Sequence, residues 1–402
     1  MCAKNILSDE ENPANDLGSE KAKGIDEKSF KTRFYSFLYS RKGVNTIFWI
    51  AAAGHIIMAL IFPDNSDYLS YIHDWTWYPL GFYLFFNEFY LIWYHLPKLI
   101  FMCCFLVADY QLLRKLFYTG KEYEQISEKM RFWAVMYILL SPIFAYVNWG
   151  GLFDSLIGLI ILNFILLFEN IRMNIIIRNL LALVLIVACV LIKYVGVVLI
   201  VPFFLGDYIL RRSNPYQQLL EKRIRTNLLF IICIVLIAVV GIIFYSIFFS
   251  PVQFDLLISP FFKSAERLYT TTYDVLLLNN EPISLIVFTD IFSALGVYIF
   301  LVSLLITYFL CYKKKASLNA WITLSVFDFL TFFQISHIQF ILWVVFPFTL
   351  YYLKKTPNDE HLTRKYALLQ CIGLLINFHL PFIQFLYLYF IVDIFRIESN
   401  HS

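Results

Sequence analysis

The feature that most constrains this chain is a series of apolar stretches, each long enough to approach the thickness of a lipid bilayer. A spanning helix needs about 20 mostly apolar residues. Eleven stretches approach this length, and the last can break into two at His379–Pro381. They cover residues 45–62, 94–113, 132–148, 152–168, 175–192, 194–210, 227–249, 284–311, 317–332, 337–353 and 366–391. Because backbone groups inside a bilayer must be hydrogen-bonded locally, the sequence predicts an all-α bundle of 11 or 12 transmembrane helices.

The composition excludes the main alternatives. Of the 402 residues, 60% are hydrophobic and 15% are charged, whereas a soluble domain is about 45–50% apolar and about 25% charged. Soluble domains of this total length cannot bury so much apolar surface. The net charge of +3 gives no case for nucleic-acid binding, and the seven cysteines lack the spacing of a zinc site. The sequence therefore predicts an integral, multi-pass protein surrounded by membrane lipids.

The positions of lysine and arginine predict the orientation. Of these 32 residues, 27 lie in the amino-terminal tail or in alternate connections between spans. Cytoplasmic loops carry such an excess. We therefore expect residues 1–44 to be a polar, disordered cytoplasmic tail, 45–396 a transmembrane domain and 397–402 a polar terminus. Segments 63–93 and 250–283 are expected to be outer loops, with short helices that lie on the membrane surface.

Polar residues from four separate parts of the chain gather at the outward-facing ends of the predicted spans. Ionisable groups in or beside a membrane are costly, so by default they indicate function. Two aspartates follow the first span, an Asn and an Asp flank a Gly-Gly hairpin, a lysine lies in a turn, and a His and a Gln begin a later span. These residues are Asp64, Asp67, Asn148, Asp154, Lys193, His337 and Gln339.

Each of these residues also has a structural interpretation. Asp64 and Asp67 could be turn residues, and Asp154 could cap the start of its helix. His337 could cap a helix or bind interfacial water. Lys193 could extend to the membrane interface, although it is the only cation of its turn and lies on the side that the charge rule disfavours. An interfacial aromatic belt could explain Trp75, Trp77, Trp93, Trp149 and Trp343.

Three segments carry a resemblance to a known family, the multispanning GT-C glycosyltransferases. Leu140–Ser155 (LSPIFAYVNWGGLFDS) resembles their Pro-containing helix followed by an Asn, Gly and Asp hairpin. Lys193–Pro202 (KYVGVVLIVP) resembles their signature of Lys, an aromatic residue, an aliphatic run and Pro. His337–Pro347 (HIQFILWVVFP) is similar to a late helix with Gln, an aromatic residue, Leu-Trp and Pro.

The early part of the chain is similar to the same pattern but departs from it at one position. Tyr78-Pro79 and the stretch from Leu96-Pro97 to Asp109 match, whereas Leu80 stands where a second Pro is expected. The resemblance covers roughly residues 45–350. The polyprenol-phosphate-mannose-dependent mannosyltransferases are the most similar group.

The resemblance implies a GT-C-like fold and an inverting membrane glycosyltransferase. It implies a polyprenyl-phosphate sugar donor, with mannose favoured, and a lipid, glycan or protein acceptor on the extracytoplasmic face. It also implies an aspartate in the first outer loop that acts as base or positions the acceptor. The motif places this residue on Asp67 or Asp64, and the Asp67-Tyr68 step is the better match, so Tyr68 joins the substrate-binding candidates.

The chemistry of such a transfer agrees with these residue types. The acceptor hydroxyl loses a proton, which a carboxylate can take. The leaving lipid phosphate carries charge, so it needs a cation, and Lys193 would supply it. His337 and Gln339 would hydrogen-bond the phosphate or the sugar, and Asn148 and Asp154 would order the hairpin.

Two other functions stay open: a multispanning transporter or lipid flippase, and a non-catalytic scaffold subunit. A transporter places polar groups near the bilayer midplane, where the candidates are Asp109, Asn163, Asp290, Asp328 and Asn377. The expected location is a cell membrane, or the endoplasmic-reticulum membrane in a eukaryote, with a cytoplasmic amino terminus. No cofactor is implied with certainty, and a divalent metal between Asp64 and Asp67 stays open.

Overall fold

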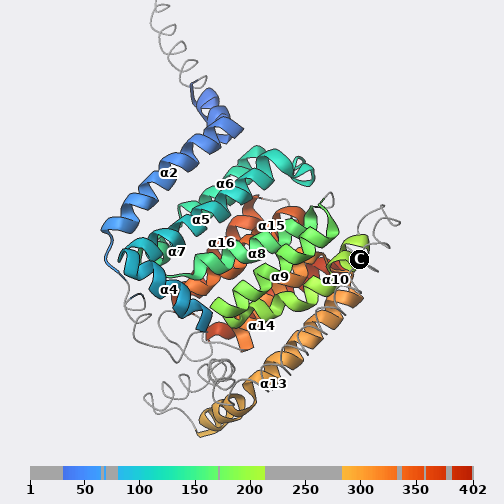
Figure 1. The fold of residues 1–402 in the computed structure, drawn as a ribbon. Coiled ribbons are helices and arrows are strands. Elements are labelled where there is room, and N and C mark those ends of the chain that lie inside the picture. Colours follow the sequence, from blue (N-terminus) through green and yellow to red (C-terminus); the bar gives the residue numbers. More distant parts are fainter. Residues whose placement is uncertain are drawn as a thin grey trace, which may run out of the picture. The chain divides into compact units, whose positions relative to one another are not determined.

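The protein is all-helical in the part of the chain that its structure describes. The computed structural model describes residues 30–64, 68, 80–170, 173–212, 283–332, 337–356, 359–376 and 383–400. Every regular element in these residues is a helix, which confirms the all-α part of the predicted fold class (Figure 1). The predicted span 227–249 lies outside the described residues, as do 250–282 of the predicted outer loop and Asp67.

The first described helices follow the predicted spans, with ends set by recognisable residues. They are α2 (Arg41–Ile61), α4 (Leu80–Ile92), α5 (Leu96–Arg114), α6 (Glu128–Leu139), α7 (Pro142–Trp149), α8 (Asp154–Glu169), α9 (Ile175–Ile192) and α10 (Ile200–Arg212). The Ser127 side chain accepts the Met130 N–H and caps α6. The predicted span 132–148 is interrupted before Pro142, which lacks the N–H needed to continue α6.

The later helices are α13 (Ile283–Lys313), α14 (Leu318–Phe332), α15 (Ile341–Lys355), α16 (Asp359–Ile376) and α17 (Leu388–Asn400). Short 3-10 helices precede three of the helices: Tyr194–Leu199 before α10, Ile338–Phe340 before α15 and Ile383–Tyr387 before α17. The last predicted stretch, 366–391, therefore forms parts of two helices, α16 and α17. The break expected at His379–Pro381 lies outside the described residues.

Four helices in the described residues are long and apolar enough to cross a membrane. They are Arg41–Ile61, Leu96–Thr119, Glu128–Trp149, which comprises α6 and α7, and Ile175–Ile192. Shorter apolar helices occur at Tyr194–Asp207, Val297–Lys313 and Leu318–Phe332. These lengths and compositions indicate a membrane protein, and the larger number of 11 or 12 spans stays a prediction.

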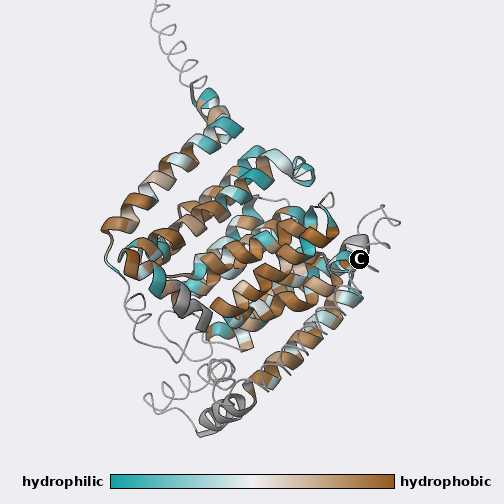
Figure 2. Ribbon diagram, in the orientation of Figure 1, coloured by the Kyte–Doolittle hydropathy of each residue, from teal (hydrophilic) through white to brown (hydrophobic). Residues whose placement is uncertain are grey.

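The core is built from helices that are buried on all sides. α14 is buried at every residue from Leu318 to Thr331, and α15 at every residue from Ile341 to Leu353. α8 packs against α5, α9 and α15, and α14 packs against α13, α15 and α17. In contrast, α9 and α13 expose large apolar side chains, including Val184 and Leu305, and Figure 2 shows in brown that both helices are rich in hydrophobic residues. Apolar exposure on this scale marks a surface that contacts lipid or other apolar partners.

The chain divides into two compact units, Met1–Ile50 and Ala51–Ser402. In the first unit, residues 30–39 form a helix that exposes Phe30, Phe34 and Phe37. Every described site residue belongs to the second unit.

Candidate functional site

Lys193 lies in an aromatic enclosure where α9 ends. Its extended backbone (φ −155°, ψ 136°) separates α9 from the 3-10 helix Tyr194–Leu199. The ammonium nitrogen Nζ lies 4.8 Å from the centre of the Phe340 ring, 5.3 Å from that of Phe153 and 5.7 Å from that of Trp343. Aromatic faces attract cations at such distances. Because Lys193 is only 7% exposed, the interpretation that it extends to the membrane interface is wrong.

Asp154 connects α8 to α15 beside this enclosure. It is the first residue of α8 and is 1% exposed. Its Oδ1 accepts a hydrogen bond from the indole Nε1–H of Trp343 at 2.8 Å. Phe153 is the N-cap of α8, and no side-chain cap bond forms there. Asp154 lies in the first turn of α8, one residue after the N-cap, where the helix dipole favours a carboxylate.

His337 and Gln339 precede α15 in the 3-10 segment next to the same enclosure. His337 is the N-cap of this segment, but its side chain makes no cap hydrogen bond, so its capping interpretation is also wrong. Its ring centre lies 5.3 Å from that of Phe340, which in turn stacks on Trp343 at 4.3 Å. Gln339 is buried. His337 is thus separated by one ring from the Lys193 ammonium.

Asp64 lies in a second cluster, formed by the end of α2 and the start of α5. Its Oδ1 is 2.9 Å from Nζ of Lys98, and its Oδ2 accepts a hydrogen bond from the hydroxyl of Tyr94. Lys98 is fully buried and also donates to the carbonyl of Phe62 at 2.7 Å. Asp64 therefore holds the residues after α2 against α5.

The partners of Asp64 determine its ionisation. Burial alone would raise the pKa of Asp64, but hydrogen bonds from Tyr94 and Lys98 and the charge of Lys98 lower this pKa below its usual value. Burial and the hydrogen bond to Asp64 raise the pKa of Tyr94 to about 12. At neutral pH the cluster therefore contains a carboxylate and a protonated phenol.

Tyr68 belongs to the predicted first outer loop and contacts the Gly-Gly hairpin. It is fully buried, and its hydroxyl donates to the carbonyl of Tyr94. Gly151 has φ +83°, a conformation that favours glycine, and a Cβ atom there would come within 2.5 Å of Cδ2 of Tyr68. The hairpin therefore needs glycine at this position for both its backbone shape and its packing.

Asn148 and its neighbour fix the other side of the hairpin. Asn148 is fully buried and donates from Nδ2 to the carbonyl of Phe144 at 2.6 Å. Trp149 donates from Nε1 to Nδ1 of His55 at 3.1 Å. Nε2 of His55 is 2.8 Å from the carbonyl of Leu139, so the two contacts together require the tautomer with its proton on Nε2. These bonds agree with the expected role of Asn148 in ordering the hairpin.

A row of aromatic rings connects the two clusters. Ring centres lie 5.4 Å apart for Tyr68 and Phe86, 6.5 Å for Phe86 and Phe101, and 6.2 Å for Phe101 and Phe153. Ser155 in the first turn of α8 donates to the carbonyl of Phe101 at 2.7 Å. Asp154 accepts a hydrogen bond from the indole of Trp343, and the Lys193 ammonium lies over the same ring, so both side chains meet the start of α15. Tyr94 connects Asp64 to Tyr68, which packs against the hairpin.

Sequence reasoning missed three partners in these clusters. The sequence pattern does not indicate Lys98 or Tyr94 as site residues. It indicates an interfacial belt for Trp343, which is fully buried instead. A signal for Lys98 exists, because it is one of the five Lys and Arg residues outside the basic segments. Among the described residues no group of three His, Cys, Asp or Glu side chains could hold a metal ion. The predicted metal pair includes Asp67, which lies outside them.

Comparison with known proteins gives no match: no family model, curated protein or solved structure matches this chain.

Proposed function

We propose that the protein is a multi-pass membrane glycosyltransferase that moves a sugar from a polyprenyl-phosphate donor to an acceptor on the extracytoplasmic side. The observation that carries this proposal is the meeting of Lys193, Asp154 and the start of α15 at one end of α8. The same end contacts the first loop through Tyr68. A transfer of this kind needs a cation, a carboxylate and polar groups in one place, and the GT-C resemblance links the same segments.

Lys193 is proposed to stabilise the leaving phosphate. In the reaction, the acceptor oxygen bonds to the anomeric carbon while the bond from that carbon to the phosphate oxygen breaks. The electron pair of the broken bond stays on the phosphate oxygen, so negative charge develops there. The aromatic faces of Phe153, Phe340 and Trp343 attract the lysine ammonium and hold it in position. A cation held in position in this way stabilises developing negative charge.

Asp67 is proposed to accept the proton of the acceptor hydroxyl, and Asp64 to position the loop. Both oxygens of Asp64 already accept hydrogen bonds, from Tyr94 and Lys98, and its pKa is lowered. A carboxylate with a lowered pKa is a weaker base. Asp64 is therefore better suited to hold the start of the loop that carries Asp67.

The test is transfer of label from polyprenyl-phosphate [³H]mannose or [³H]glucose in membranes that contain the protein, whose own lipids and glycans supply acceptors. Asp67→Asn should lower the rate roughly 100-fold or more, because general-base catalysis typically contributes that much. Lys193→Met should impair use of the donor more than use of the acceptor, and Lys193→Arg should restore part of the rate.

The matched control is Lys121→Gln. Lys121 is an exposed cation distant in the fold from Lys193, beyond the Glu169 end of α8, and its loss should leave transfer unchanged. Equal melting temperatures would show that the variants are folded. Absence of transfer from both donors, or full activity of Asp67→Asn and Lys193→Met together, would overturn the proposal.

One observation favours a second candidate, a transporter. Asp109 in α5 is fully buried, and neither of its carboxylate oxygens has a hydrogen-bond partner among the described residues. It lies inside the candidate span Leu96–Thr119. A buried carboxylate at this depth is typical of a proton relay. Loss of proton uptake into protein-containing liposomes with Asp109→Asn, but not with Asp67→Asn, would favour the transporter.

A further inference from the structure

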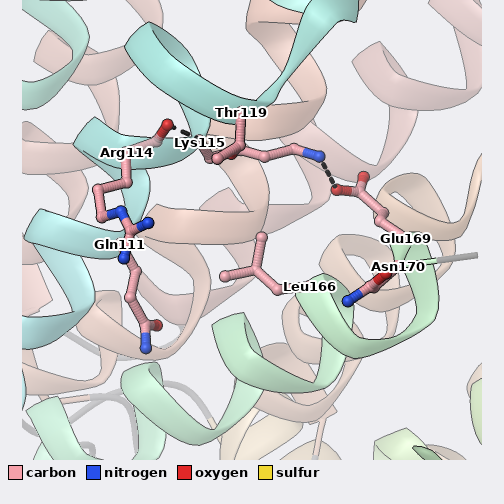
Figure 3. Close-up of a pocket in the computed structure, with 7 residues that line it drawn as sticks. All are labelled: Gln111, Arg114, Lys115, Thr119, Leu166, Glu169 and Asn170. Atoms are coloured by element: carbon pink, nitrogen blue, oxygen red, sulfur yellow. Dashed lines mark hydrogen bonds and ion pairs between the residues drawn. The ribbon is translucent and has the colours of Figure 1, made fainter. Parts of the chain in front are cut away.

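A polar pocket lies at the other end of α8, away from Lys193 and Asp154. It has a volume of about 420 Å³ and is lined by Gln111, Arg114, Lys115, Thr119, Leu166, Glu169 and Asn170 (Figure 3). Asp154 is the first of the 16 residues of α8 and Glu169 the last. At 1.5 Å per residue these two ends are roughly 23 Å apart. The pocket is therefore a separate site from the one described above.

An unusual helix ending shapes one wall of the pocket. α5 continues beyond Arg114 as a π-helical turn, Lys115–Thr119, which contributes Lys115 and Thr119 to the wall. The hydroxyl of Thr119 donates to the carbonyl of Arg114 at 3.3 Å. Gly120 ends the turn, where a Cβ atom would lie 2.5 Å from the carbonyl oxygen of Lys115. Turns of the π type are rare and occur often at functional sites.

The pocket contains two cations, and one of them, Arg114, can bind a ligand. The ammonium of Lys115 lies 2.8 Å from Glu169 and 2.7 Å from Glu122, so carboxylates already bind it. Arg114 is exposed, and its guanidinium makes no hydrogen bond or ion pair within the described part of the chain. A guanidinium presents paired N–H donors that match two phosphate oxygens.

The same pocket holds an unused hydrogen-bond acceptor. Gln111 donates from Nε2 to Oδ1 of Asn163 at 3.1 Å, while its Oε1 is buried and has no partner among the described residues. A buried acceptor without a donor costs free energy. The pocket is thus suited to a ligand that has an anionic group and, on the other side, an N–H or O–H donor.

We infer that this pocket binds the head group of a membrane phospholipid, namely a phosphodiester whose substituent carries an ammonium or hydroxyl donor. The phosphate would bind Arg114, and the donor would bind Glu169 and, once the Gln111 side chain turns to expose it, Gln111 Oε1. The inference rests on the membrane part of the proposed function, because the pocket lies at the end of the candidate span Leu96–Thr119, where a bilayer presents its head groups. It does not depend on sugar transfer.

The experiment compares short-chain phospholipids with the same acyl chains and different head groups: two zwitterionic lipids, with and without an N–H donor, and one anionic lipid with hydroxyl donors. Binding of dihexanoyl phosphatidylethanolamine, phosphatidylglycerol and phosphatidylcholine to the purified full-length protein is measured in detergent. The first two should bind about tenfold more tightly than phosphatidylcholine, whose trimethylammonium has no N–H. Arg114→Gln should weaken all three by about tenfold, the loss expected for one charge-assisted hydrogen bond. Gln111→Leu should remove the preference over phosphatidylcholine.

Lys121→Gln is the matched control, because it removes one exposed cation nearby that does not line the pocket. Equal binding of the three lipids, or equal binding by Arg114→Gln and Lys121→Gln, would overturn the inference. Glycerophosphoethanolamine has the same head group without acyl chains and is the water-soluble comparison. If it binds as tightly as dihexanoyl phosphatidylethanolamine, the assignment to a lipid is overturned. Melting temperatures verify folding. Unchanged sugar transfer by Arg114→Gln would separate this site from the proposed transfer site.

Discussion

The two ends of α8 hold their cations in different ways. At the Asp154 end, Lys193 lies against three aromatic faces. At the Glu169 end, Arg178 of α9 binds both oxygens of Asp207 in α10, at 2.5 and 2.6 Å, and lies over the Phe168 ring at 4.6 Å. Both members of this ion pair are buried. A two-point ion pair fastens two helices, whereas aromatic faces position a cation where three elements meet.

This difference indicates that Arg178 has a structural role and that Lys193 is suited to bind a charged ligand. Arg178 is fixed in place by one carboxylate of its own chain, so its substitution should act on stability. Lys193 is positioned where three elements meet, so its substitution should act mainly on transfer.

Removing the arginine at the Glu169 end should have the largest effect. Arg178→Met leaves Asp207 as a buried carboxylate without its cation, which typically costs about 3–5 kcal/mol. Unfolding of the protein in mixed detergent micelles measures this loss. The double variant Arg178→Met with Asp207→Leu should recover most of the stability, because no buried charge then stays unpaired. A double variant less stable than either single variant would contradict the structural role of the pair.

Adding a methyl group at the hairpin should have the next largest effect. Gly151→Ala forces alanine into φ +83° and drives its Cβ into the Tyr68 ring, which should cost roughly 1–3 kcal/mol. Gly150→Ala is the matched control, since Gly150 has φ −74° and ψ −5°, which any residue adopts. Gly151→Ala should also lower sugar transfer because it displaces the loop. Equal stability of the two variants would show that the hairpin tolerates the change.

The smallest effect concerns the pH dependence of Asp64. Its pKa in the folded protein lies below the unfolded value of 3.8, so the carboxylate contributes stability above that value. This contribution is lost as the pH falls through the folded-state pKa. The difference in unfolding free energy between wild type and Asp64→Asn should be constant above about pH 5 and shrink below about pH 4. A difference that stays constant down to pH 2.5 would show that Lys98 and Tyr94 do not lower the pKa of Asp64.

The sequence predicted the helices well because their signal is local. α5, α9 and the stretch that forms α6 and α7 are continuous apolar segments, and Pro142 marks the one interruption that the span 132–148 contains. Lys193 was found in the same way, as a single cation within an otherwise apolar turn. Its enclosure by Phe340 and Trp343 depends on the packing of distant helices, which local composition does not encode.

The partners in the two clusters were missed for the same reason. Lys98 and Asp64 are 34 positions apart, and Asp154 and Trp343 are 189 positions apart. Both pairs depend on how helices meet in three dimensions. Tryptophan is enriched at membrane interfaces, which is why Trp343 could be explained by an interfacial belt. That enrichment concerns location and does not predict the partner of the indole N–H.

The hydrogen bonds of His55 have a consequence for the order of assembly. The break between α6 and α7 leaves the carbonyl of Leu139 without its usual partner further along the helix, and Nε2 of His55 in α2 satisfies it instead. An unpaired carbonyl costs several kcal/mol in lipid. Ribosomes synthesise α2 before the broken helix, so the chain makes this donor before it makes the carbonyl that needs it.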